Sequence, residues 1–178
     1  FCFSIQLVTG MLLLFYYQPT VADAHASVEL ITVHVGGGAL IRNLHTWSSS
    51  AMIFCVLTHL ITAFAMKAFE KPREITWVSG VLLLLITFGF GFTGYLLPWH
   101  QRAFWATTVG TSIAGAVPFV GEFINEVLRG GTDLSALTLA RFFSVHIWWL
   151  PAAIIALIGV HMYMIIRLGI SSVPTKED

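Results

Sequence analysis

Four histidines in two apolar segments carry side chains that could bind a metal, and their spacing decides what they could hold. His45 and His59 are 14 residues apart, and His146 and His161 are 15 apart. At about 100° per residue, these spacings return to within roughly 40° and 60° of the same helix face. A rise of about 1.5 Å per residue separates the members of a pair by roughly 21 Å. Each pair therefore lines one side of its helix, with an imidazole toward either end.

If the two helices face each other, each histidine meets one from its partner. Two bis-imidazole sites would then be stacked across a hydrocarbon core of about 30 Å. Neutral imidazole is a common axial ligand of haem iron, and two such ligands leave no open position for oxygen. The spacing predicts two haem b groups with an electron-transfer role. The alternative is that intramembrane histidines relay protons, as in a transporter, or bond within the core, and neither role needs haem.

The composition predicts that this chain lies in a membrane. Hydrophobic residues make up 57% of the sequence, charged residues 10%, and the mean hydropathy is +0.83. We expect an all-α membrane protein, a bundle of four transmembrane helices, because four stretches without Asp, Glu, Lys or Arg are near or above the roughly 20 residues needed to span. Net charge is zero without a basic run, so nucleic acid is not an expected partner. The four uncharged stretches are 1–22, 43–66, 76–101 and 142–166.

The expected helices are bounded by prolines and polar residues. The first ends near residue 17, and since Phe1 is an implausible start, we expect the chain to begin within or before that helix. Residues 18–33 read as a loop, and the whole of 1–178 as a single domain. Pro98 should end the third helix, over 77–97, and Pro151 should kink the fourth, over 139–168. Between them, 99–138 is long enough for two short amphipathic helices on the membrane surface.

Charge sets the expected topology. The short connection 67–74 contains three basic residues, which the positive-inside rule places in the cytoplasm together with the polar tail from residue 171. The two histidine-bearing helices then run parallel. His45 therefore pairs with His146 near the positive side of the membrane, and His59 pairs with His161 near the other.

Glycines and arginines occur where a haem would need them. Gly80 and Gly94 are again 14 residues apart on the third predicted helix, and Gly10 lies on the first. A flat macrocycle between helices needs close approach of the backbone, although glycines alone would more often indicate ordinary helix packing. Arg42 and Arg141 lie at the positive-side ends of their helices, where cations could pair with haem propionates. The alternative is that these two arginines only extend their charged groups to the membrane interface.

Several segments together resemble a known family. The sequence is similar to the amino-terminal half of cytochrome b, and most similar to the split cytochrome b6 type. The spacing of 15 in the fourth helix also resembles the b6 branch, since the mitochondrial type generally has 14 in both helices. The matching segments are FYYQPTV at 15–21, LH at 44–45, KPREITWV at 71–78, GYLLPW at 94–99 and TLARFFSVH at 138–146.

The resemblance implies the dihaem subunit of a quinol:cytochrome c or quinol:plastocyanin oxidoreductase. Such a subunit carries electrons from quinol oxidation on the positive side to a quinone site on the negative side. It works with a Rieske iron-sulfur protein, a c-type cytochrome and a separate carboxy-terminal cytochrome b chain resembling subunit IV, in a dimeric complex among membrane lipids. The implied location is a bacterial inner membrane, with the thylakoid as the alternative. The sequence does not decide whether an additional covalent haem c is present.

The family also builds part of its quinol pocket from the surface helix after the third span, here near 101–111. Phe104, Trp105, Thr108 and Val109 are the expected lining residues. The acidic motif that deprotonates quinol belongs to the missing half, so this chain alone would not complete the reaction.

Two further interpretations follow from this segment. His100 replaces the family's usual glycine or aspartate, and we expect it to face solvent rather than to handle protons. The competing function is a dihaem cytochrome b anchor of a hydrogenase or another dehydrogenase. Such an anchor would lack the amphipathic segment between the third and fourth helices.

Overall fold

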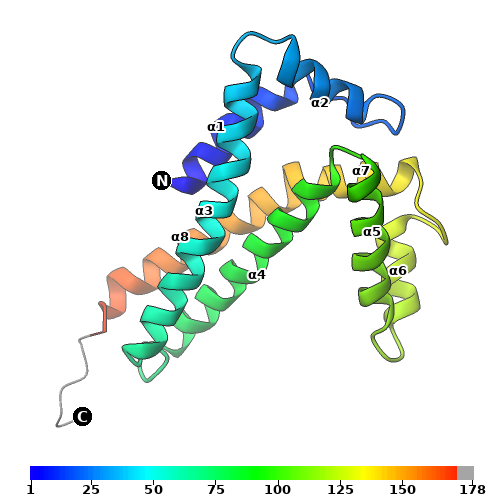
Figure 1. Ribbon diagram of the computed structural model, residues 1–178. Coiled ribbons are helices and arrows are strands. Elements are labelled where there is room, and N and C mark those ends of the chain that lie inside the picture. Colours follow the sequence, from blue (N-terminus) through cyan, green and yellow to red (C-terminus); the bar gives the residue numbers. More distant parts are fainter. Residues whose placement is uncertain (172–178) are drawn as a thin grey trace.

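The structure is a computed structural model that describes residues 1–171, and the predicted cytoplasmic tail beyond Ser171 lies outside the described residues. Within that range the chain forms helices and turns without strands, so the all-α prediction is confirmed. Figure 1 shows their arrangement. The helices are α1 (Cys2–Leu14), α2 (Ala24–Val33), α3 (Gly38–Ala65), α4 (Glu74–Leu96), α5 (Gln101–Gly115), α6 (Gly121–Arg129), α7 (Ala136–Ser144), the π-helical turn η1 (Val145–Trp149) and α8 (Leu150–Leu168).

Three helices in the described part of the chain are long and apolar enough to cross a membrane. They are α3, α4 and the continuous helix Ala136–Leu168, which joins α7, η1 and α8. The remaining predicted span, which is the first in the sequence, corresponds to α1, whose 13 residues extend only about 20 Å. In Figure 1, α1 packs beside the upper part of α3, while α4 packs along α8.

The prediction of a loop over 18–33 is wrong, because this segment contains the helix α2. Ala24, Ser27 and Ile31 recur at helical spacing and are buried, and α2 packs against α3. The buried face of α2 contains only these three residues, and one of them is a serine. The hydrophobic periodicity of the segment is therefore weak. Ten residues are also too few to register as a span.

Pro151 is preceded by a π-helical turn rather than by regular α-helix. Proline has no N–H to donate, and its ring collides with the carbonyl four residues earlier. Val145–Trp149 adopt the wider π-helix, in which the Leu150 N–H bonds to the Val145 carbonyl. The chain therefore stays helical from α7 through α8, and His146 lies inside the π turn.

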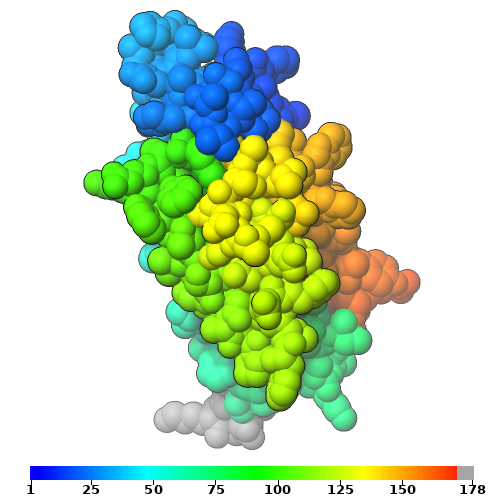
Figure 2. Space-filling model, turned by 90° about the vertical axis from the view of Figure 1, so that its right-hand side faces the viewer, coloured from blue at the N-terminus to red at the C-terminus, as the bar shows by residue number. Residues whose placement is uncertain are grey.

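The two predicted surface helices are present as α5 and α6, which pack side by side at the right of Figure 1 and in front in Figure 2. Arg129 at the end of α6 holds them together. Its guanidinium donates to the Thr111 hydroxyl at 2.8 Å, the Ser112 hydroxyl at 3.0 Å and the Thr108 carbonyl at 3.3 Å. This arginine therefore has a specific set of hydrogen-bond partners on α5.

Candidate functional site

A cavity of about 710 Å³ lies among α1, α3, α4 and the π turn. Its volume falls within the roughly 300–1,000 Å³ of small-molecule and cofactor sites. His45 from α3 and His146 from η1 line it, together with Gly10, Gly94 and Arg42. Most of its other lining is aliphatic or aromatic, as a hydrophobic macrocycle requires.

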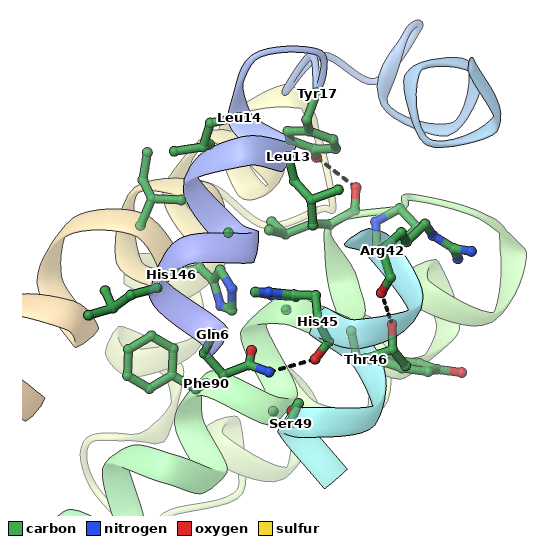
Figure 3. Close-up of a pocket in the computed structure, with 18 of the residues that line it drawn as sticks. Gln6, Leu13, Leu14, Tyr17, Arg42, His45, Thr46, Ser49, Phe90 and His146 are labelled. Carbon is green, nitrogen blue, oxygen red and sulfur yellow. Dashed lines mark hydrogen bonds between the residues drawn. The ribbon is translucent and has the colours of Figure 1, made fainter. Parts of the chain in front are cut away.

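The two histidines of this cavity face each other, as Figure 3 shows. Their ring centroids are 6.5 Å apart, with an interplanar angle of 69°. Two metal–nitrogen bonds of about 2 Å, plus the distance of a little over 1 Å from each nitrogen to its ring centre, would separate the centroids by about 6.3 Å. The observed separation therefore fits one metal ion held between the two imidazoles.

Each of the three predicted glycines lies against the edge of one histidine ring. A Cβ added at Gly94 would stand 2.7 Å from Cε1 of His146. At Gly10 it would stand 3.3 Å from Cε1 of His45. Gly80 has the same relation to His161, also at 3.3 Å. The glycines thus leave room for the imidazoles themselves.

Three hydroxyl groups that the sequence analysis missed hydrogen-bond the same rings. Each belongs to the residue directly before one of these glycines, and all three are buried. The signal was available, because a Ser or Thr precedes each glycine in the sequence. The distances from hydroxyl to Nδ1 are 2.9 Å for Thr9 and His45, 2.9 Å for Thr93 and His146, and 2.8 Å for Ser79 and His161.

The second pair of histidines is less enclosed. His161 packs against Ser79 and Gly80 of α4, whereas His59 is exposed on α3 and has no hydrogen-bond partner within residues 1–171. The cavity described above contains neither residue.

The two predicted arginines are placed differently. Arg42 lines the cavity. Arg141 does not, because its guanidinium donates to the Val127 carbonyl at the end of α6 and lies against Gly130. Of the two, only Arg42 lies beside the cavity, and in Figure 3 its guanidinium is directed away from the two histidine rings.

Two polar residues close the end of the cavity near α5. Burial raises the pKa of the Tyr17 hydroxyl, which donates to the Leu97 carbonyl at 2.7 Å. His100, which we expected to face solvent, is half-buried, lines the cavity and caps α5 by accepting the Ala103 N–H at 3.0 Å. Its ring centroid lies 6.2 Å from that of His25.

The predicted quinol-pocket residues share the outward side of α5. Trp105 and Val109 are each 57% exposed, and Phe104 and Thr108 are half-buried. None of the four lines the cavity between the histidines. They therefore form a surface separate from the histidine site.

Comparisons with known proteins agree with the resemblance found in the sequence. Residues 1–169 match the family profile Cytochrome b/b6/petB. Cytochrome b6 of Cyanidium caldarium is 44% identical over 96% of this chain and 79% of its own length. Cytochrome b6 of Trichodesmium erythraeum (strain IMS101) is 45% identical over 96% of this chain and 77% of its own. A cytochrome bc complex cytochrome b subunit of Chlorobaculum thiosulfatiphilum is 46% identical over 97% of this chain and 40% of its own.

A solved structure extends this similarity to the fold. A chain of a hyperthermophilic respiratory Complex III superposes with a TM-score of 0.89 and is 30% identical. The match covers 99% of this chain and 49% of that one, so the chain spans about half the length of its structural neighbour. The resemblance is confirmed: this chain belongs to the cytochrome b/b6 family.

Proposed function

We propose that this chain is the dihaem electron-transfer subunit of a quinol-oxidising complex of the bc or b6f type. It carries electrons across the membrane, from quinol oxidised on the positive side to a quinone site on the negative side. The observation that carries the proposal is the opposed pair His45 and His146, with centroids 6.5 Å apart across a cavity large enough for a cofactor. Relatives named cytochrome b6 and cytochrome bc complex cytochrome b subunit support the class.

The four histidines would hold two haem b groups, in the pairs His45 with His146 and His59 with His161. Bound haem supplies a reversible one-electron carrier. Because each iron would have two imidazole ligands, no position is left for oxygen. Gly10, Gly80 and Gly94 keep space beside the rings, and Arg42 would pair with a propionate once its guanidinium turned toward the cavity. Arg141 could do so only after releasing the Val127 carbonyl.

The spacing of the histidines along α3 indicates that the proposed electron path runs across the membrane. His45 and His59 are about 21 Å apart along the helix axis, which is most of a hydrocarbon core of about 30 Å. Two carriers at these depths divide one long transfer into shorter steps. Electron movement between them displaces charge across the membrane.

Quinol chemistry requires partners. We assign Phe104, Trp105, Thr108 and Val109 to the wall of the quinol pocket, completed by a separate carboxy-terminal cytochrome b chain and the Rieske protein. The outward position of these side chains on α5 supports this assignment. A c-type cytochrome would accept the electron from the Rieske centre, in a dimeric complex of a bacterial inner membrane.

The test is a redox-titrated visible spectrum of the purified complex with a haem count by type. We expect two low-spin b haems with separate midpoint potentials, and loss of one of them in His146→Ala. Absence of haem from the intact, folded complex would overturn the proposal and return the histidines to a proton-relay role. Haem present without quinol:cytochrome c activity in the whole complex would favour the dehydrogenase anchor.

A further inference from the structure

We infer that three Ser/Thr–Gly dipeptides fix the orientation and the tautomer of three of the predicted ligand histidines. Thr9–Gly10, Ser79–Gly80 and Thr93–Gly94 are the only such dipeptides in the 178-residue sequence. Each faces one of the four predicted ligands, through the hydroxyl at Nδ1 and the glycine at Cε1. The inference about iron rests on the proposed function, whereas the inference about the imidazole proton does not.

The direction of each hydrogen bond follows from where the hydroxyl proton goes. A hydroxyl group has one proton to donate. In all three residues it is directed to a backbone carbonyl about one helical turn earlier, so the oxygen has only lone pairs to offer the imidazole. The bonds are Thr9 to Ile5 at 2.5 Å, Thr93 to Gly89 at 2.7 Å and Ser79 to Thr76 at 2.8 Å.

Each imidazole must therefore donate from Nδ1. The ring proton lies on Nδ1, and the lone pair of the neutral ring lies on Nε2, which is the atom available to a metal. Burial protects this arrangement from water, because Thr9, Ser79 and Thr93 are 5%, 4% and 5% exposed. The glycine of each dipeptide fixes the same ring at its Cε1 edge. His45 and His146 consequently point toward each other into the cavity (Figure 3).

The two predicted haem sites differ in how many of their histidines are held by such a dipeptide. At the positive-side site both ligands, His45 and His146, are held in this way. At the other site His161 is held by Ser79, but His59 has no hydroxyl partner in the part of the chain that the structure describes. Donation from Nδ1 makes an imidazole a more basic ligand, which favours ferric iron. Thr9 and Thr93 thus lower the midpoint potential of the positive-side haem.

Thr93→Val in the intact complex tests this inference, with Thr87→Val as the matched control. Thr87 lies on the same helix, is 2% exposed and donates to the Leu83 carbonyl at 2.8 Å, without a histidine partner. We expect Thr93→Val to raise the midpoint potential of the His45/His146 haem, to change its electron paramagnetic resonance g values and to weaken its retention about 10- to 100-fold. Thr93→Ser should restore all three properties.

A second position makes the test site-specific. Ser79→Ala should shift only the haem held by His161, and Thr9→Val should reproduce the effect of Thr93→Val. The inference is overturned if both haems are present and Thr93→Val behaves like Thr87→Val. It is equally overturned if Thr93→Val shifts both haems alike. If the parent complex holds no haem, the proposed function fails, and nitrogen-15 spectra of labelled histidines then decide the inference alone: protons on Nδ1 support it and protons on Nε2 contradict it.

Discussion

Gly94 is the most tightly packed of the three glycines beside the histidines. An added Cβ would lie 2.7 Å from the His146 ring, against 3.3 Å for Gly10 and Gly80 at their own histidines. Gly94→Ala should therefore displace His146, cost about 1–3 kcal/mol of stability and lower the content of the haem proposed for the His45/His146 site. Gly80→Ala should have a smaller effect, confined to the other haem. Haem counts and separate redox titrations measure both.

A control for these glycine variants is available on α8. Gly159 has open space where its Cβ would go, so Gly159→Ala should leave both haems unchanged. Equal shifts of the two midpoint potentials in Gly94→Ala would contradict the assignment of this glycine to His146.

Spacing alone was sufficient to find the histidines and their glycines, because period and residue type are both visible in a sequence. The hydroxyls of Thr9, Ser79 and Thr93 were missed because serine and threonine are common in apolar helices, where they usually bond their own backbone. The sequence favours Arg141 only by its position at a helix end. Its side chain bonds the Val127 carbonyl, a contact that depends on where α6 packs and that no local pattern reveals.

At the scale of helices, the π turn corrects the register of the histidine pairs. In a regular α-helix, a spacing of 15 leaves His161 rotated by about 100° from where a spacing of 14 would put it. A π turn accommodates one additional residue. Beyond η1, the 15-residue interval in the last helix therefore behaves like the 14-residue interval in α3. Periodicity analysis assumes one constant pitch, so it could predict a disturbance at Pro151 but not this compensation.

Removing one residue from the π turn tests this explanation. Deletion of Trp148, which is 72% exposed, combined with Pro151→Ala, should give a regular α-helix with both histidines still facing their partners. We expect both haems to be retained. Insertion of one alanine after Ala156 should instead rotate His161 by about 100° and remove the haem proposed for the His59/His161 site. Haem counts that ranked these two variants in the opposite order would refute the explanation.

At the scale of the whole molecule, the two sites differ in enclosure. A cavity surrounds His45 and His146, whereas His59 is exposed. We expect detergent that separates this chain from its complex to release the His59/His161 haem first. Visible spectra and haem counts taken through such a treatment would follow the loss, and simultaneous release of both haems would argue against unequal enclosure.

The α5 and α6 pair forms a broad outer face of the molecule (Figure 2), and Arg129 joins the two helices. Arg129→Met removes these hydrogen bonds and should loosen the pair by roughly 1–3 kcal/mol. Proteolysis between α5 and α6 should become faster, and the quinol oxidation proposed for the complex should slow. Both haem potentials should stay unchanged, since Arg129 does not line the histidine cavity; a shift in either would show that the pair is coupled to the haem sites.

The π turn also has a consequence for comparing sequences. A π turn contains one residue more than the α-helical turn that it replaces, so it marks the position of a one-residue insertion. Here that position is Val145–Trp149. In some cytochromes b the histidines that correspond to His146 and His161 are only 14 residues apart. When this chain is aligned with them, the single gap belongs within those five residues. Placed nearer His161, the gap would pair exposed positions in the first half of α8 with half-buried ones, and apparent substitutions there would be artefacts of register.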